Sequence, residues 1–166
     1  MERIWAPWRM EYILNSDKPD GCIFCFEHKP EEMRERLVLA RTKFSIVMLN
    51  RYPYTSGHLL IAPLNHTAEL DDLSEEGLFD LFQTTRIAKR LLFEIAGPDG
   101  CNIGMNLGKS AGAGVAEHMH VHIVPRWNGD TNFMTVIPDI RIMPENLKDT
   151  YDRFFPLFNK TFTEMA

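Results

Sequence analysis

Long apolar runs are missing from this chain of 166 residues. No stretch approaches the roughly 18 consecutive apolar residues that a membrane-spanning helix needs, so no membrane association is expected. The opening residues Met1-Glu2-Arg3-Ile4 carry charge and are not followed by the apolar core of a signal peptide, which makes a cytoplasmic location the expectation. Internal repeats, low-complexity tracts and linkers are also missing, and the length favours a single domain over residues 1–166.

Cysteine and excess positive charge are scarce as well. Three cysteines are too few for the disulfide framework of a small secreted protein, and in a reducing compartment they suggest metal or redox chemistry. The formal net charge is −5, whereas proteins that bind nucleic acid nonspecifically usually present a basic face. We therefore expect no nucleic-acid partner, although a local pocket of donors can still bind a small anion.

What the chain does have is a row of histidines at every second position. His118, His120 and His122 are half of its six histidines. Apolar residues alternate with them: Met119, Val121 and Ile123. This pattern is typical of a strand, so all three imidazoles should project from one face and make a candidate for catalysis. Ordinary half-exposed strand histidines, or a plain zinc or copper site, remain the alternatives.

A second pattern is the pair Cys22-Ile23-Phe24-Cys25, which follows the turn-forming residues Pro19-Asp20-Gly21. The spacing suits either zinc binding or dithiol redox chemistry. A redox pair normally opens a helix after a strand, and that context is missing here. Zinc would need two further ligands, and the available donors are histidines: His28, His66 and His118.

A glycine-rich loop, Gly108-Lys109-Ser110-Ala111-Gly112-Ala113-Gly114, precedes the histidine row. Together with Gly104 it resembles a phosphate-binding P-loop, but it is one residue too short and is followed by a strand, so we reject that motif. Glycine lets backbone N–H groups converge on an anion, and the loop can still bind phosphate. A flexible connection between strands is the alternative.

Hydrophobic patterns predict five strands and two main helices. The strands are expected at 37–40, 44–49, 58–63, 101–106 and from His118 onward. One helix spans 74–96, with Ser74 as its N-cap and Gly97-Pro98 at its end. Its expected buried stripe is Leu78, Leu81, Phe82, Thr85, Ala88, Leu92 and Ile95. The other is a C-terminal helical extension over 144–160, broken near Pro156.

Three further segments have weaker signals. Residues 31–36 are strongly charged and predict a short solvated helix or loop. Residues 1–20 contain two tryptophans and two prolines, and we expect them to form an arm that packs on the domain or on a partner subunit. A loosely held terminus is the alternative. Residues 131–143 read as extended chain.

Taken together, these motifs resemble the histidine triad (HIT) family. The signature is His118-Met119-His120-Val121-His122-Ile123-Val124, continued by Pro125-Arg126. Stretches similar to the fragile-histidine-triad branch are 49–53, 57–63 and 80–85. Stretches closest to the bacterial diadenosine tetraphosphate phosphorylases, or ATP adenylyltransferases, are Trp5–Arg9, Tyr52–Tyr54, Asn106–Gly112, Ala116–His118 and Pro125–Trp127.

The resemblance implies an α+β, HIT-like fold: a five-stranded antiparallel sheet with one long helix and a C-terminal helix, assembled into a homodimer or larger homo-oligomer. It implies that the partners are adenine nucleotides and that diadenosine tetraphosphate and phosphate are converted to ADP and ATP, without an organic cofactor. A hydrolase of dinucleoside polyphosphates or of AMP esters and amides is the nearest alternative. A zinc-bearing nucleotide-binding module with little turnover is another.

Residue roles also follow from the resemblance. His120 would be the nucleophile that holds AMP, flanked by His118 and by His122, which would lie near the scissile oxygen. The implied nucleotide- and phosphate-binding residues are Met48 and Leu60 at adenine, Asn50 at ribose, His58 and Asn106 at phosphate or the nucleophile, Gly112, Ala113 and Gly114 in the phosphate loop, and Trp127. The phosphorylases have Gly-Gly-Ser where this chain has Gly112-Ala113-Gly114, which leaves phosphate or water open as the second nucleophile.

The resemblance finally implies a structural zinc, held by Cys22, Cys25, His66 and His118. Four protein ligands would close its coordination shell. His28 is the competing ligand. If zinc binds the ring of His118, that ring is not free for catalysis.

Overall fold

The computed structural model describes residues 21–27, 29–130 and 145–165. The predictions for the arm 1–20, for His28 as a zinc ligand and for the extended segment 131–143 therefore lie outside the described residues. Among the helices of the described ranges, none is both long and apolar enough to cross a membrane.

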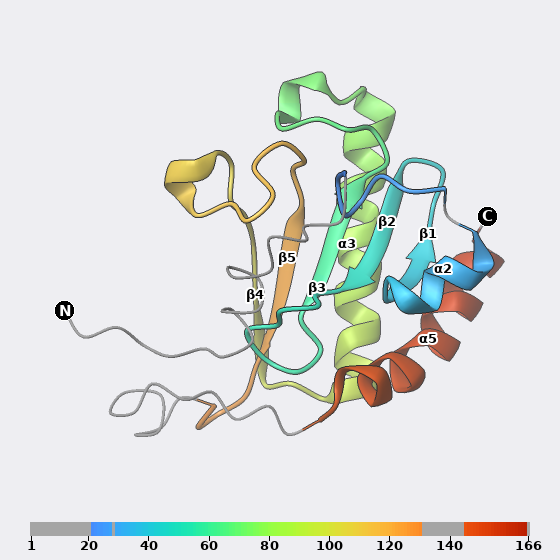
Figure 1. Ribbon diagram of the computed structural model, residues 1–166. Helices are drawn as coiled ribbons and strands as arrows, with labels where there is room; N and C mark the ends of the chain where they lie inside the picture. The colour runs from blue at the N-terminus through green and yellow to red at the C-terminus, as the bar shows by residue number, and fades with distance from the viewer. Residues whose placement is uncertain (1–20, 28, 131–144, 166) are drawn as a thin grey trace.

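Five strands form one antiparallel sheet in the order β1-β2-β3-β5-β4 (Figure 1). Their bounds are Val38–Arg41 for β1, Ser45–Leu49 for β2, Leu59–Pro63 for β3, Gly100–Met105 for β4 and Val121–Arg126 for β5. The last strand thus lies inside the sheet, between β3 and β4. The predicted α+β class and five-stranded antiparallel sheet are confirmed.

The strand of the histidine row begins later than predicted, at Val121 instead of His118. The reason lies in β3, because the residue that would face Met119 in a continued ladder is Pro63, which has no N–H to donate. The N–H of Met119 instead donates to the carbonyl of Thr67 at 2.7 Å. His118 and His120 therefore lie on a segment held by a loop, and His122 lies in the strand.

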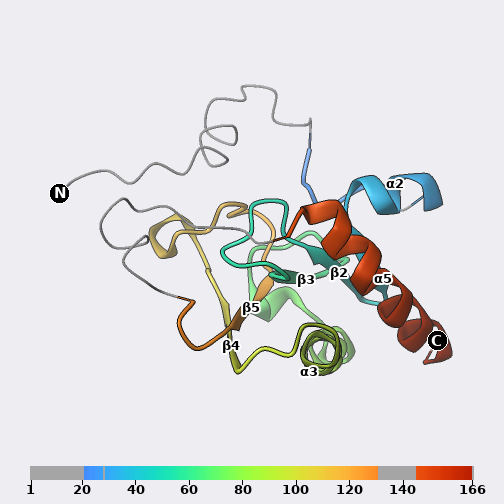
Figure 2. The same ribbon diagram turned by 90° about the horizontal axis from the view of Figure 1, so that it is seen from below.

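The long helix α3 (Glu75–Ala96) packs on one face of the sheet, below it in Figure 2. The Ser74 hydroxyl accepts a hydrogen bond from the Gly77 N–H, and Gly97 ends the helix in the left-handed conformation, as predicted. The predicted stripe was wrong at Phe82, which is 51% exposed. The buried arc is rotated past it, and it contains Gly77, Leu81, Thr84, Thr85, Ile87, Ala88, Leu91 and Leu92.

The C-terminal helix α5 (Leu147–Glu164) packs four aromatic rings into the same core: Tyr151, Phe154, Phe158 and Phe162. It was predicted to break near Pro156 but continues through this residue. Pro156 is exposed, and the carbonyl that it leaves without a donor belongs to exposed Asp152, where water can hydrate it. The other helices within the described ranges are short: α2 (Pro30–Glu35), η1 (Leu70–Asp72) and η2 (Lys109–Ala111).

The other face of the sheet carries a second, smaller apolar cluster. Its buried members are Phe24, Val38, Ile46, Met48, Leu60 and Ala62. Figure 2 shows the segment that leads into α2 on this side, opposite α3. Met119, Val121 and Ile123 belong to the core on the α3 side. The alternation from Met119 to Ile123 therefore turns the three histidines to the opposite face, where Phe24 of the second cluster lies beside His118 and His120. That the histidines share one face was predicted; the second cluster was not.

Candidate active site and metal centre

The sheet register brings the histidine row beside the predicted adenine slot. His122 pairs with Leu60 of β3 on one side and with Gly104 of β4 on the other, and Leu60 pairs with Met48 of β2. Directly paired residues of an antiparallel sheet point to the same face. Met48 and Leu60 thus lie in one row with His122, and both are buried in the second cluster.

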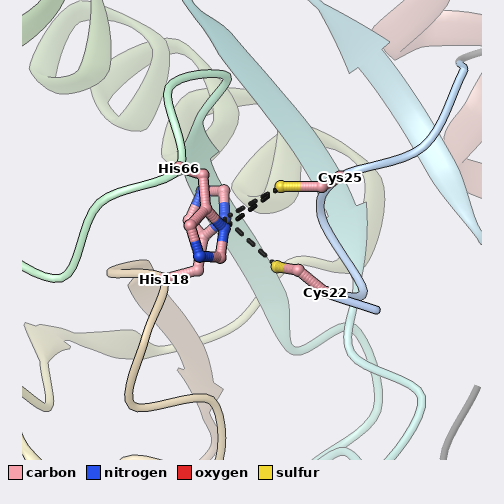
Figure 3. A group of neighbouring side chains, drawn as sticks. All are labelled: Cys22, Cys25, His66 and His118. Carbon is pink, nitrogen blue, oxygen red and sulfur yellow. Dashed lines mark hydrogen bonds between the residues drawn. The ribbon is translucent and has the colours of Figure 1, made fainter. Parts of the chain in front are cut away.

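Four predicted metal ligands converge at one edge of this region (Figure 3). The Nδ1 atom of His118 lies 3.2 Å from the sulfur of Cys22, 3.5 Å from that of Cys25 and 3.2 Å from Nδ1 of His66. Nδ1 of His66 lies 3.3 Å from the sulfur of Cys25. These ligands come from the turn before α2, the loop after β3 and the segment before β5.

This donor set fits a tetrahedral cation. Nε2–H of His118 donates to the carbonyl of Pro63 at 2.8 Å, so its Nδ1 carries a lone pair. One lone pair cannot serve three close neighbours by hydrogen bonding, whereas a central cation would be coordinated by all four atoms. Zinc with bonds of about 2.0–2.3 Å has ligand-to-ligand separations of roughly 3.3–3.8 Å, close to the distances found here.

The Cys25 thiol needs such a cation to ionise at neutral pH. Burial, with a hydrogen bond and charge repulsion from Cys22, raises the pKa of Cys25 to about 11. Zinc binds thiolates, and its positive charge would reverse this shift. The His118 ring uses both nitrogens, at Pro63 and at the cluster, which leaves neither for a substrate.

His120 and His122 form a separate pair, with ring centroids 4.7 Å apart. Nδ1–H of His120 donates to the carbonyl of His118 at 3.0 Å, so Nε2 of His120 carries the lone pair. On the other ring, Nδ1 of His122 lies 2.9 Å from Nε2 of His58. Nδ1 of His58 accepts from the Tyr54 backbone N–H at 3.1 Å. His58 must therefore donate to His122, whose own proton is then on Nε2.

The three rings of this group are uncharged at neutral pH. Burial lowers the pKa of His120. Burial and the charge of His120 lower the pKa of His122 to about 4, and burial with the charges of both neighbours lowers the pKa of His58 to about 3. Within the described residues, Nε2 of His122 is buried without a hydrogen-bond partner. His120 thus presents a lone pair on its Nε2, and the adjacent ring of His122 presents an N–H on its Nε2.

Asn50 and Tyr54 support this group from the loop between β2 and β3. The predicted ribose ligand Asn50 has its Nδ2 3.2 Å from Nδ1 of His58, and its Oδ1 accepts from the Tyr52 N–H at 2.9 Å. The Tyr54 ring lies over His58 and His122, with centroid distances of 4.8 and 6.1 Å. The sequence did not assign Tyr54 to the site, and its place four residues before the predicted phosphate ligand His58 was the available signal.

The glycine loop is folded on itself in this structure. The N–H groups of Gly112 and Ala113 donate to the carbonyls of Lys109 and Gly108, at 3.0 and 3.4 Å. Gly112 has φ +86°, a conformation that side chains rarely adopt. The N–H groups of Gly112 and Ala113, which were predicted to bind phosphate, therefore form hydrogen bonds within the loop.

The remaining predicted residues lie at opposite ends of β5. Asn106 follows Met105, which pairs with Val121, so Asn106 lies at the level of His120. Trp127 follows the far end of β5, and the whole strand separates it from His120. The sheet register thus places Asn106 level with the histidine pair and Trp127 at the opposite end of β5.

Residues 31–129 match the model of the HIT domain. The chain is 40% identical over 158 residues to AP-4-A phosphorylase of Mycobacterium tuberculosis, covering 90% of this chain and 80% of that protein. It is 31% identical over 128 residues to an adenosine 5'-monophosphoramidase of Schizosaccharomyces pombe, covering 77% of this chain and 91% of that protein. A Zn-bound histidine triad family protein of Mycobacterium smegmatis superposes with a TM-score of 0.61 at 26% identity, covering 77% of this chain and 87% of that one.

Proposed function

This chain belongs to the HIT family, and from that premise we propose that it is a nucleotidyltransferase that converts diadenosine tetraphosphate and phosphate into ADP and ATP. One observation carries the proposal: His120 presents an Nε2 lone pair directly beside the N–H of His122. A neutral imidazole is a good nucleophile, and a positioned N–H stabilises charge on a leaving oxygen. The 40% identity to an AP-4-A phosphorylase supports this choice of substrate.

The first step is transfer of AMP to the protein. Nε2 of His120 attacks the α-phosphorus, the bond from phosphorus to the bridging oxygen breaks, and ATP leaves. His120 keeps its Nδ1 proton and becomes a cationic adduct, whose N–H still donates to the carbonyl of His118. Nε2–H of His122 donates a hydrogen bond to the bridging oxygen, where negative charge develops.

The second step releases AMP to phosphate. An oxygen of inorganic phosphate attacks the same phosphorus, the bond from phosphorus to Nε2 breaks, and ADP forms. His120 regains its lone pair, so both steps balance without a redox partner. The hydrogen bond from His58 holds His122 in one tautomer through both steps.

Substrate recognition is assigned to the second apolar cluster. Met48 and Leu60 would contact the adenine, and Asn50 lies beside them at the end of β2. Asn106, at the level of His120, would donate to the phosphate under attack. Cys22, Cys25, His66 and His118 would hold zinc, which in a closed shell stabilises the fold and does not contact substrate.

The test is a product assay on the full chain. Diadenosine tetraphosphate is incubated with and without inorganic phosphate in water enriched in oxygen-18, and the nucleotides are identified by mass. The proposal requires ADP and ATP, dependent on phosphate and free of the heavy isotope. AMP that carries the isotope, formed equally without phosphate, overturns it.

A hydrolase is the second candidate function. The 31% identity to an adenosine 5'-monophosphoramidase favours it, and Gly114 provides no side-chain hydroxyl to bind a phosphate nucleophile. The same assay, run with an AMP amide as substrate, distinguishes the two. Isotope-labelled AMP from the amide together with no phosphorolysis identifies the hydrolase. No turnover on either substrate identifies a binding module.

A further inference from the structure

The turn between the two predicted cysteine ligands also reaches the histidine pair. The N–H of Cys25 donates to the carbonyl of Cys22 at 3.1 Å, and Phe24 between them is 1% exposed. The centroid of the Phe24 ring lies 5.0 Å from that of His118 and 5.1 Å from that of His120. One side chain of the turn therefore contacts both a predicted metal ligand and the predicted nucleophile.

A second connection runs through the peptide group between His118 and Met119. Its carbonyl accepts from Nδ1–H of His120 at 3.0 Å, and its N–H donates to the carbonyl of Thr67 at 2.7 Å. Thr67 directly follows His66. The carbonyl that keeps the proton on Nδ1 of His120 is thus held by the segments that carry the two histidine ligands.

We propose that Phe24 is a positioning residue for the nucleophile, and that occupancy of the metal cluster controls catalysis through Phe24 and this peptide group. The inference rests on the proposed function and adds a regulation of that site. With a cation bound, the turn is fixed and the Phe24 ring keeps the His120 ring against the His118 carbonyl. Without it, the turn and His118 are released, and His120 can take the other tautomer, whose Nε2 carries a proton and cannot attack phosphorus.

The effect should fall on the rate, and the stripped protein, although less stable, should stay folded at the assay temperature. Neither Phe24 nor the four cluster residues belong to the main core, which α3 and α5 build on the opposite face of the sheet. Groups that orient a reacting residue from behind typically change activity by about 10-fold to 100-fold. We expect a loss of kcat in this range, with KM for the dinucleotide nearly unchanged.

The experiment compares five forms of the full chain: zinc-loaded wild type, chelator-stripped wild type, the stripped protein after zinc is returned, Phe24→Leu and Phe158→Leu. Phe158 is the matched control, because it is fully buried in the main core away from the site. Two kinds of measurement are made at one neutral pH. Kinetics give kcat and KM on diadenosine tetraphosphate, and long-range nitrogen–proton NMR correlations without substrate give the tautomer of His120.

The proposal expects Phe24→Leu and the stripped protein to lose kcat and to show a fraction of His120 protonated on Nε2, with recovery on zinc return. Phe158→Leu should match wild type. A pure Nδ1–H tautomer in the stripped protein and in Phe24→Leu overturns the proposal. A rise in KM at unchanged kcat in Phe24→Leu also overturns it, because Phe24 would then belong to the nucleoside slot. An equal loss of kcat in Phe158→Leu overturns it as well.

The tautomer measurement needs no substrate, so it separates this inference from the proposed function. A protein without phosphorolysis whose His120 tautomer follows zinc keeps the inference and overturns the function. Should Phe24→Leu fail to fold, the stripped and reloaded wild-type protein still gives both readouts.

Discussion

His58 lies behind His122, with its Nε2 2.9 Å from Nδ1 of that ring, and it is completely buried. The Tyr54 N–H occupies the other nitrogen of His58, which fixes the direction of the hydrogen bond from His58 to His122. Under the proposed function, we therefore expect His58 to act on the leaving group through His122, and not to contact phosphate directly as the resemblance implied.

The first prediction concerns this positioning role. His58→Ala removes the donor to Nδ1 of His122, so we expect a loss of kcat of about 10-fold to 100-fold on diadenosine tetraphosphate. The loss should shrink for an AMP ester of nitrophenol, whose leaving group needs little stabilisation. His58→Gln offers an amide N–H to His122 and should recover part of the rate. Equal losses on both substrates would argue against a role at the leaving oxygen.

The second prediction concerns the nucleophile. His120→Ala removes the lone pair that attacks phosphorus, and activity should fall by about a thousandfold or more. Rapid acid-free quenching of wild type with substrate should yield a protein heavier by one adenylyl group, detected by intact mass. The adduct should be missing in the variant. An adduct of the same mass on His120→Ala would assign the nucleophile to another residue.

Much of this site was predictable from the sequence. The alternation of histidines and apolar residues from His118 to Ile123 predicted that the histidines share one face, and Ser74 and Gly97 predicted the limits of α3. These features depend on local geometry. The resemblance gave the four residues of the metal cluster, which the structure brings together from 96 positions apart in the chain.

Other features depend on tertiary contacts and could not be predicted. The start of β5 depends on Pro63 in another strand, and the exposure of Phe82 depends on the angle of α3 against the sheet. Assembly into a homo-oligomer and a cytoplasmic location stay predictions.

The third prediction concerns the metal cluster. Purified protein should contain one zinc per chain, and Cys22→Ser with Cys25→Ser should lose it. Loss of a structural metal should lower Tm by roughly 10 °C, since several kcal/mol of unfolding free energy are removed. Metal analysis and thermal unfolding measure both effects. Cys101→Ser is the control, because Cys101 packs beside the main core and should keep the zinc. Equal zinc content in both variants would place the ion elsewhere.

The fourth prediction concerns the pH dependence of stability. His58 and His122 have ordinary pKa values near 6.5 in the unfolded chain, and burial lowers them to about 3 and about 4 in the native protein. Above pH 6.5 neither state is protonated. As the pH falls, the unfolded chain binds protons first, so each histidine lowers the free energy of unfolding by about 1.4 kcal/mol per pH unit. This loss ends near pH 4 for His122 and near pH 3 for His58.

Urea denaturation between pH 7.5 and pH 4.5 measures how the free energy of unfolding changes with pH. Wild type and His58→Leu should be compared after removal of zinc, so that metal binding at the cluster does not contribute. In His58→Leu one of the two titrating groups is gone, and His122 loses a neighbouring charge. The free energy of unfolding of the variant should therefore fall less steeply with decreasing pH than that of wild type, by about one proton. Parallel curves would mean that His58 is protonated as readily in the native protein as in the unfolded chain, which is incompatible with a neutral ring donating to His122.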